Sequence, residues 1–473
     1  MKNIILNRTK IIATIGPASS SKKILHEIIL SGVDAIRLNF SHGSHKYHKK
    51  VIQMVRALSE EMNTPISIIQ DLQGPKIRIG KIKGSEIELK EGEELRIHSK
   101  DIIGTDKDIS IINKDLFNDI KINERILIDD GKIQLNVISK NKTLIKTVVL
   151  RSGILKSNKG VNLPQTNILL SSITEKDKED LFFGLDNEVD WIALSFVRSA
   201  NDIIQLRKLI ESKKRKTKII AKIEKPQAIK NIDEIIKVSD SLMVARGDLG
   251  VETPMESVPL YQKKIVEKCN KGFKPVIIAT QMLESMIDQK TPTRAETNDV
   301  ANAVLDGTDA VMLSAESATG KYPILAVKSM DKIIHSVEKN SNIIYNKFFN
   351  KNKNLNDSLI RSACRLSKLI NAKAIVAMTK SGYTGFRVSG HRPKATIFIV
   401  TNNKKLLNVM NLVWGIRGIY YDKTDYIDNT LENIESILVK NKYLKKYDKY
   451  IITSSMPSHW KGHTNMMKVN VIE

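Results

Sequence analysis

Lys222, Glu224 and Asp248 are the residues whose types and spacing point most directly to chemistry. Lys222 and Glu224 end one apolar run, in AKIEKP (221–226), and Asp248 ends the next, in VARGDLG (244–250). Side chains alternate between the two faces of a strand, so Lys222 and Glu224 project to the same side. Two carboxylates beside a lysine suit a Mg²⁺ ion that holds a phosphorylated anion. A lone Lys-x-Glu is more often a surface salt bridge. The neighbouring apolar runs must therefore show whether these residues belong to an active site.

Short apolar runs bounded by turns recur along the chain and predict strands. They lie at 10–16, 35–40, 67–72, 191–196, 218–224, 241–246, 275–281 and 310–316. Helical patterns separate most of them, as at 22–30, 45–61, 201–211 and 258–270. Eight such repeats predict a (β/α)8 TIM barrel, an α/β fold whose active site lies at the carboxyl ends of the strands. Polar residues gather at those ends: Thr14, Arg37, Asn39, Ser41, Asp71, Ser195, Lys222, Glu224, Asp248, Thr280 and Glu316.

The barrel pattern is interrupted, and a further domain follows it. Residues 74–170 contain alternating strand patterns, an Asp130-Gly131 hairpin turn and no convincing helix, which predicts an inserted all-β domain. At the catalytic end of a barrel this β-barrel-like domain would act as a lid that excludes water. The barrel is thus expected to comprise 1–73 and 171–340, and 341–473 a C-terminal α/β domain.

The C-terminal domain is expected to begin with a linker or exposed helix and to contain strands at 374–379, 396–401, 450–454 and 468–472. Its first strand runs into TKSGYTG (379–385), a loop rich in hydroxyl groups and glycine. Backbone N–H groups of such a loop can hold a phosphate. An ordinary strand-to-helix turn with a Ser/Thr cap explains the composition equally well.

Composition narrows the class of protein. A chain of 473 residues with 41% hydrophobic residues predicts about three domains, and no apolar run could span a membrane. The N-terminus lacks an apolar signal segment, and Cys269 and Cys364 have no metal-ligand spacing, so a cytoplasmic protein is expected. The net charge of +24 invites a nucleic-acid function. Because the lysines are dispersed and only 5% of residues are aromatic, no specific nucleic-acid partner is expected.

Long motifs identify the chain as similar to the pyruvate kinases over almost its whole length. They are RTKIIATIGP (8–17), IRLNFSHGSHKYH (36–48), DLQGPKIRIG (71–80), SNKGVNLP (157–164), AKIEKPQAI (221–229), MVARGDLGVE (243–252), IIATQMLESM (277–286), the run 292–323 and TKSGYTG (379–385). The resemblance implies phosphoryl transfer from phosphoenolpyruvate to ADP, giving pyruvate and ATP in the last step of glycolysis. It also implies a homotetramer and a phosphorylated allosteric effector bound by the C-terminal loop (Thr379, Ser381, Gly382 and Thr384).

The resemblance also assigns site residues. Glu224 and Asp248 are expected to bind Mg²⁺ or Mn²⁺, and Lys222 to neutralise the transferring group. The peptide N–H groups of Gly247 and Asp248 should hold the substrate carboxylate, while Thr280 relays a proton through water.

Further positions match phosphate, nucleotide and monovalent-cation sites of the family. Arg37 is expected to contact the substrate phosphate, and Asn39, His42, Arg78 and Lys159 the nucleotide. The implied K⁺ site comprises Asn39, Ser41, Asp71 and the carbonyl of Leu72.

Two positions depart from the commoner family pattern. Position 76 is Lys where many K⁺-requiring members have Glu, so the Lys76 ammonium could replace K⁺ and make it dispensable. The alternative is that Lys76 points to solvent and the oxygen cluster binds K⁺ normally. The sequence VSGHRP (388–393) lacks the aromatic residue that the family more often shows before Arg-Pro, which leaves the identity of the effector open.

Two rival functions stay open. Phosphoenolpyruvate lyases and mutases use a similar metal site on a barrel, although they lack the lid with Lys159. An RNA-binding module has only the charge in its favour.

Overall fold

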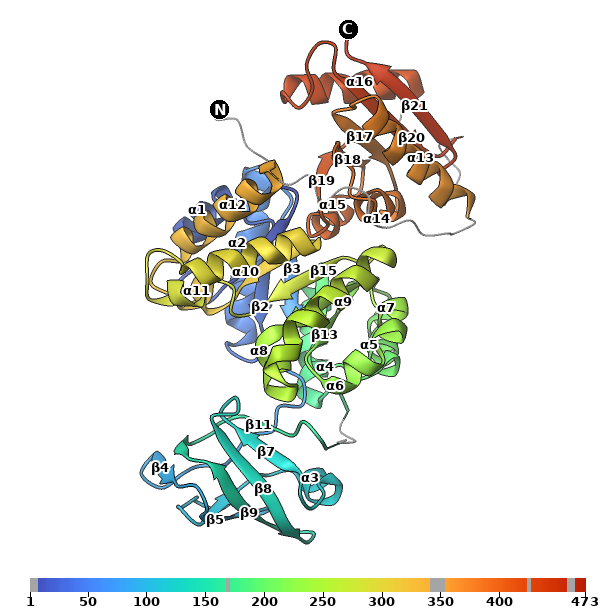
Figure 1. The fold of residues 1–473 in the computed structure, drawn as a ribbon. Coiled ribbons are helices and arrows are strands. Elements are labelled where there is room, and N and C mark those ends of the chain that lie inside the picture. Colours follow the sequence, from blue (N-terminus) through green and yellow to red (C-terminus); the bar gives the residue numbers. More distant parts are fainter. Residues whose placement is uncertain (1–6, 167–170, 341–353, 423–426, 457–463) are drawn as a thin grey trace.

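The computed structural model describes residues 7–166, 171–340, 354–422, 427–456 and 464–473. Within these ranges the chain forms a barrel, a separate β domain inserted into it and a C-terminal α/β domain (Figure 1). The predicted fold class is therefore confirmed. No helix in these ranges is both long and apolar enough to cross a membrane. Most of the expected linker, residues 341–353, lies outside the described part of the chain.

The barrel is a closed ring of eight parallel strands, and each predicted strand is one of them. They are β1 (Lys10–Thr14), β2 (Ala35–Asn39), β3 (Ser67–Asp71), β12 (Trp191–Leu194), β13 (Lys218–Ile223), β14 (Ser241–Ala245), β15 (Val276–Ala279) and β16 (Ala310–Leu313). The ring order is β1-β16-β15-β14-β13-β12-β3-β2, so the first and last strands pair, with Lys10 opposite Ala310. The strands are buried almost throughout because helices cover the outer face of the ring.

Helices alternate with these strands around the ring (Figure 1). They are α1 (Lys22–Leu30), α2 (His45–Glu61), α4 (Glu175–Asp186), α5 (Ala200–Ser212), α6 (Pro226–Lys230), α7 (Ile232–Val238), α8 (Arg246–Glu252), α9 (Val258–Lys271), α10 (Arg294–Asp306), α11 (Ala315–Ala318) and α12 (Pro323–Asn340), with 3-10 turns η1 (Met255–Ser257) and η2 (Glu284–Ile287). Local signals set their ends. Thr293 and Glu296 form a capping box at the start of α10, which stops at Gly307 in the left-handed conformation (φ +93°).

The lid lies between β3 and α4 and has its own hydrophobic core. Its strands are β4 (Glu86–Leu89), β5 (Glu94–His98), β6 (Asp108–Ser110), β7 (Arg125–Ile128), β8 (Ile133–Lys140), β9 (Leu144–Arg151), β10 (Gly153–Lys156) and β11 (Val161–Asn162). Six of them form a sheet in the order β11-β7-β8-β9-β5-β6, and β10 pairs with β4. The β7–β8 hairpin turns at Asp130 and Gly131, whose φ angles of +57° and +82° suit the predicted turn.

One helix in the lid corrects the expectation that this segment contains none. Helix α3 spans Lys114–Asp119. The Asn113 side chain accepts a hydrogen bond from the Leu116 N–H (3.2 Å), and Leu116 and Phe117 are buried in the lid core. A capped turn of six residues that buries two apolar side chains is too short to show a helical period in the sequence.

The C-terminal domain contains a five-stranded sheet in the order β19-β18-β17-β20-β21. Its strands are β17 (Ala374–Met378), β18 (Thr396–Thr401), β19 (Ile416–Tyr420), β20 (Lys449–Ser454) and β21 (Met466–Val471), and its helices are α13 (Leu355–Leu369), α14 (Tyr383–Gly390), α15 (Lys404–Met410) and α16 (Ile427–Lys440). Strand β21 is antiparallel to β20, whereas the other neighbours are parallel. Strand β19 was not predicted, because Arg417 and Gly418 interrupt its apolar run.

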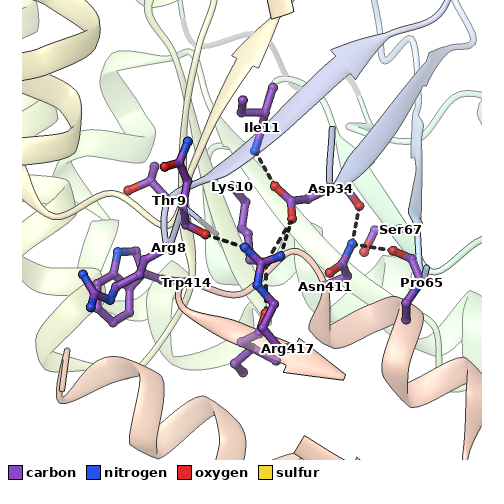
Figure 2. A network of polar contacts seen from close by, with 12 residues as sticks. Arg8, Thr9, Lys10, Ile11, Asp34, Pro65, Ser67, Asn411, Trp414 and Arg417 are labelled. Carbon is purple, nitrogen blue, oxygen red and sulfur yellow. Dashed lines mark hydrogen bonds and ion pairs between the residues drawn. The ribbon is translucent and has the colours of Figure 1, made fainter. Parts of the chain in front are cut away.

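A buried polar network joins the C-terminal domain to the start of the barrel strands (Figure 2). We call Lys10, Asp34, Asn411 and Arg417 the interface network. The fully buried Lys10 ammonium donates to Asp34 Oδ1 and to the Ile416 carbonyl, both at 3.0 Å. Arg417 Nη1 lies 3.5 Å from the same Asp34 oxygen, and Asn411 donates to the Asp34 carbonyl (2.7 Å). One carboxylate thus compensates two cations at the end of the barrel opposite the predicted site.

Candidate active site

Lys222 lies at the centre of a polar cluster at the carboxyl ends of β3, β12 and β13. Its ammonium nitrogen is 2.9 Å from Glu224 Oε1, 3.2 Å from Asp71 Oδ1 and 2.8 Å from the Ser195 hydroxyl. The Lys222 side chain is only 11% exposed. The structure therefore brings together Lys222 and Glu224, which the sequence placed on one side of a strand, and adds Ser195 after the adjacent strand β12 and Asp71 of the next strand, β3.

Arg37 extends this cluster from β2. Its Nε donates to Asp71 Oδ2 (2.6 Å) and its Nη1 donates to the Thr14 hydroxyl (3.1 Å). The Asp71 carboxylate is thereby shared between Arg37 and Lys222, and both cations are held in fixed directions at the mouth of the barrel. Two oriented cations at one end of a barrel are suited to bind a phosphorylated anion.

The charges of the cluster support one another. Burial would lower the pKa of Lys222, but the nearby Asp71 and Glu224 carboxylates raise it well above its ordinary value. Burial would likewise raise the pKa of Asp71, yet Lys222 and Arg37 outweigh burial and hold it below the ordinary value. Lys222 is therefore a permanent cation and Asp71 a permanent anion near neutral pH.

Glu224 and Asp248 fit a divalent cation. Glu224 is 1% exposed, and its Oε2 accepts a hydrogen bond from the Phe196 N–H (2.8 Å). Burial raises the pKa of Glu224; Asp248 raises it further, whereas Lys222 opposes the rise. A cation near both carboxylates would relieve this repulsion.

Two carboxylates, Glu224 and Asp248, match the number of protein ligands that is common at Mg²⁺ sites. In the described residues no three His, Cys, Asp or Glu side chains gather into a metal cage. Mg²⁺ is commonly held by one or two carboxylates, with substrate oxygens and waters as the other ligands. Asp248 lines a cleft of about 60 Å³ between barrel and lid, where a ligand could supply such oxygens.

Thr280 and Gly247 meet at the ends of β15 and β14. The Gly247 N–H donates to the Thr280 hydroxyl oxygen (2.8 Å), and that hydroxyl donates to the Ala279 carbonyl (2.6 Å). Thr280 has a φ of +69°, which is uncommon for a β-branched residue. The predicted proton relay and one of the two predicted carboxylate-binding N–H groups are thus hydrogen-bonded to each other.

The residues expected to bind nucleotide are spread over barrel and lid. Asn39 lies at the end of β2, where its side chain accepts from the Ser41 N–H (3.1 Å), and His42 is exposed in the following loop. Arg78 donates to the Asn158 carbonyl (3.0 Å) and Lys159 pairs with Asp129 (2.7 Å), all within the lid. Arg78 and Lys159 therefore contact lid residues and not the Lys222 cluster.

The residues of the expected K⁺ site lie close along the chain but are only partly joined. Ser195 donates to the Leu72 carbonyl (2.7 Å), while Asp71 is bound by Arg37 and Lys222. Lys76 is exposed and lines the cleft between barrel and lid. Among the residues that the structure describes, no hydrogen bond or ion pair joins Lys76 to Asn39, Ser41 or Asp71.

Some hydrogen-bonding groups of the C-terminal loop (379–385) already have partners within the protein. Thr379 accepts from the Gly382 N–H (3.0 Å), and the buried Thr384 hydroxyl lies 2.7 Å from the Thr464 hydroxyl. Ser381 is exposed. Gly382 caps α14 with a φ of +84°, and a side chain there would meet Leu406 at 2.9 Å. Ser381 thus presents the accessible hydroxyl at the start of this helix.

Two residues with contacts around the site were not singled out as site residues from the sequence. Ser195 was noted only as a strand end, and its bond to Lys222 depends on strands that are distant in sequence. Glu252 is buried at the end of α8, where it accepts from the lid residue Asn162 (2.8 Å) and pairs with Lys225 (2.5 Å). No local pattern marks Glu252, because its partners come from other segments.

Comparison with known proteins gives a consistent result over the whole chain. The family model described as pyruvate kinase, barrel domain, matches residues 6–327, and the model for the pyruvate kinase alpha/beta domain matches residues 357–470. A pyruvate kinase of Staphylococcus epidermidis is 42% identical, covering 99% of this chain and 81% of the relative. One from Clostridium acetobutylicum is 41% identical, covering 99% and 100%. A crystal structure of a pyruvate kinase from Cryptosporidium parvum matches with a TM-score of 0.94 at 33% identity, covering 99% of this chain and 97% of that one.

Proposed function

The chain belongs to the pyruvate kinase family, and from that premise we propose how its own residues carry out the reaction. It is a phosphotransferase that converts phosphoenolpyruvate and ADP into pyruvate and ATP. The observation that carries the proposal is the position of Lys222, held between Asp71, Glu224 and Ser195 at the barrel mouth. In phosphoryl transfer, catalysis depends mainly on positioning and on stabilising charge.

Lys222 and Arg37 stabilise the transferring phosphoryl group. Their partners fix both side chains before substrate arrives, so little reorganisation is needed during reaction. The raised pKa of Lys222 keeps the ammonium charged throughout, so it acts as an electrostatic group and not as a proton donor.

Glu224 and Asp248 would hold Mg²⁺ or Mn²⁺. When bound, the ion supplies positive charge to the phosphoryl and enolate oxygens of the substrate. The two carboxylates serve as its protein ligands, and Lys222 limits the repulsion between them when the ion is absent.

Thr280, Gly247 and Asp248 handle the rest of phosphoenolpyruvate. The N–H groups of Gly247 and Asp248 bind its carboxylate, so the Gly247 N–H exchanges its bond to Thr280 for a bond to substrate. That exchange frees the Thr280 hydroxyl oxygen to accept a hydrogen bond from a water, which gives its other proton to the enolate carbon and regains one from solvent.

Asn39, His42, Arg78 and Lys159 bind the nucleotide. Lys159 pairs with Asp129 within the lid, so we infer that it leaves Asp129 when a nucleotide phosphate enters the cleft. Lid closure would then exclude water from the transfer step.

Asn39, Ser41, Asp71 and the Leu72 carbonyl provide oxygens for K⁺, the cation used by many relatives. We propose that Lys76 makes K⁺ dispensable, because an ammonium on a flexible stem can donate to the same oxygens. Lys76 is exposed in this structure, so its side chain must move toward the barrel in the catalytic state.

The C-terminal domain is proposed to bind a phosphorylated effector at Thr379, Ser381, Gly382 and Thr384, in a homotetramer located in the cytoplasm. The free thiols of Cys269 and Cys364 suit such a reducing compartment.

The decisive experiment measures pyruvate formed from phosphoenolpyruvate with and without ADP, together with RNA binding at physiological salt. We expect turnover that depends on ADP and a divalent cation, and its loss in Lys222→Met. Lys332→Met, which removes an exposed charge from α12, is the matched control and should keep full activity. Consumption of phosphoenolpyruvate without ADP would favour a lyase or mutase, and tight RNA binding without turnover would favour the binding module.

A further inference from the structure

The turn after β15 holds two consecutive non-glycine residues in the left-handed backbone region. Thr280 has a φ of +69° and Gln281 a φ of +53°. Such backbone is costly for non-glycine residues, above all for a β-branched one, and it persists only where neighbouring groups enforce it. Groups outside the turn must therefore hold it in this shape.

Arg246 supplies that restraint. Its Nη2 donates to the carbonyl of Thr280 (2.8 Å) and to the carbonyl of Gln281 (3.1 Å). Its side chain is 11% exposed and is anchored by Asp299 of α10, with Nη1 2.7 Å from Oδ1. The planar guanidinium can reach both carbonyls and the carboxylate in one fixed orientation, which a lysine ammonium cannot reproduce.

Before substrate binds, the restraint acts on the hydroxyl of Thr280 from two sides. Arg246 fixes the backbone carbonyl of Thr280, and the N–H of the next residue, Gly247, donates to the Thr280 hydroxyl. If the turn relaxed to an ordinary φ, the hydroxyl would rotate away from the end of β14. Arg246 is thus connected to the one hydroxyl that we assign to proton transfer.

We propose that Arg246 is a positioning residue for the protonation half of the reaction, acting through the strained Thr280–Gln281 turn. The inference rests on the proposed role of Thr280. Among the described residues, no hydrogen bond or ion pair joins Arg246 to Lys222, Glu224 or Arg37, so the phosphoryl-transfer half keeps its own supports. Loss of Arg246 should therefore separate the two halves of the reaction.

The test compares two readouts in the full-length enzyme with Mg²⁺. One is deuterium exchange from solvent into the methyl group of pyruvate in the presence of ATP, and the other is ATP formed from phosphoenolpyruvate and ADP in a quenched single turnover. In Arg246→Met we expect exchange to fall about tenfold or more, the scale of a misplaced acid–base group, while ATP formation falls far less. In a Thr280→Val background the same substitution should cause no further loss of exchange.

Arg207→Met is the matched control. Arg207 also bonds one carboxylate, Asp240 (2.8 Å), and one backbone carbonyl, Val238 (3.0 Å), but at the opposite end of the barrel strands. It should leave the ratio of exchange to transfer unchanged. Arg246→Lys, which keeps the charge beside Asp299, covers the case in which Arg246→Met fails to fold, and it should lower the same ratio.

The outcomes distinguish the inferred role of Arg246 from the proposed role of Thr280. Normal exchange in Arg246→Met and Arg246→Lys, with exchange lost in Thr280→Val, would overturn the role of Arg246 and leave the proposed function standing. Equal loss of exchange and ATP formation would also overturn it, because a merely structural residue gives that pattern. Normal exchange in Thr280→Val would refute the proposed role of Thr280 and the inference with it.

Discussion

Replacing Asp34 by Asn should destabilise the contact between barrel and C-terminal domain. Asp34 compensates Lys10, which is fully buried, and Arg417, whose side chain is 21% exposed (Figure 2). Its second oxygen accepts the Ile11 N–H at 3.0 Å. An Asn side chain has the same shape but no charge, so the variant leaves two cations at the interface with no carboxylate between them.

The structure sets the size of the effect. Removing one partner of a buried ion pair costs about 3–5 kcal/mol, because the remaining charge stays desolvated. With an unfolding entropy of about 2.1 cal/mol/K per residue, a unit of roughly 380 residues shifts by about 1.3 °C per kcal/mol, so the melting transition of barrel and C-terminal domain should fall by roughly 4–6 °C. The surface pair of Asp233 and Lys268 gives a matched control: Asp233 is 65% exposed, so Asp233→Asn should cost less than about 1 kcal/mol.

The pH dependence gives an independent check. Burial, aided by Arg417 and opposed by Asp34, lowers the pKa of Lys10 from 10.5 to about 8. Between these two values the unfolded chain binds more protons than the folded one, so the contribution of Lys10 to the unfolding free energy rises with pH. Above about pH 8 folded Lys10 is neutral, and the charge of Asp34 then matters less. The destabilisation by Asp34→Asn should therefore be largest near neutral pH and shrink as pH rises.

Thermal unfolding followed by circular dichroism and calorimetry, at neutral and at alkaline pH, measures both effects. Because the chain has several domains, only the transition shared by barrel and C-terminal domain should be compared. A shift no larger than that of Asp233→Asn, with no dependence on pH, would refute the view that Asp34 balances both Lys10 and Arg417.

Four shorter predictions concern the site. Glu224→Ala and Asp248→Ala should each lower kcat greatly at ordinary Mg²⁺ while the circular dichroism spectrum stays normal; near-normal turnover would remove that residue from the metal site. Lys222→Met should lower phosphoryl transfer by about two or more powers of ten yet leave measurable metal-dependent enolisation of pyruvate, and equal loss of both would show that Lys222 mainly shapes the site. Activity should persist in buffer without K⁺ and Na⁺, and Lys76→Glu should create a K⁺ requirement; an enzyme that is silent without K⁺ contradicts this. Ser381→Glu should abolish activation by sugar phosphates or nucleoside monophosphates and keep the basal rate, whereas kinetics indifferent to all such compounds would leave the loop a structural turn.

The barrel could be predicted from the sequence because its strands are short, fully buried runs with a helix after nearly every one. Strand β19 was not predicted, because Arg417 interrupts its apolar run. The Arg417 side chain contacts Asp34 of the barrel, a role that the strand pattern does not show. Lys10 begins strand β1, and no sequence feature near it predicts that it is fully buried. The contacts of Arg417 with Asp34 and of Lys10 with the Ile416 carbonyl join residues hundreds of positions apart, which local patterns cannot reveal.

The same limit applies to the site. The spacing of Lys222 and Glu224 predicted a shared direction, and their atoms lie 2.9 Å apart. The sharing of Asp71 between Arg37 and Lys222 depends on the order of strands around the ring, which periodicity does not give. The left-handed backbone of Thr280 could not be predicted either, since propensity argues against it and tertiary contacts to Arg246 impose it.

The pairing of the first barrel strand with the last has a consequence for synthesis on the ribosome. Strand β1 cannot gain its neighbour β16 until residues 310–313 have emerged, so β1, β2 and β3 must wait as an incomplete ring with an open edge. The lid is different, because its strands all lie between residues 86 and 162 and pair only with one another. It can complete its sheet while most of the chain is still unmade. A nascent chain of this protein thus carries a finished lid beside an unfinished barrel, whose edge stays open to wrong pairing until residues 310–313 join the ring.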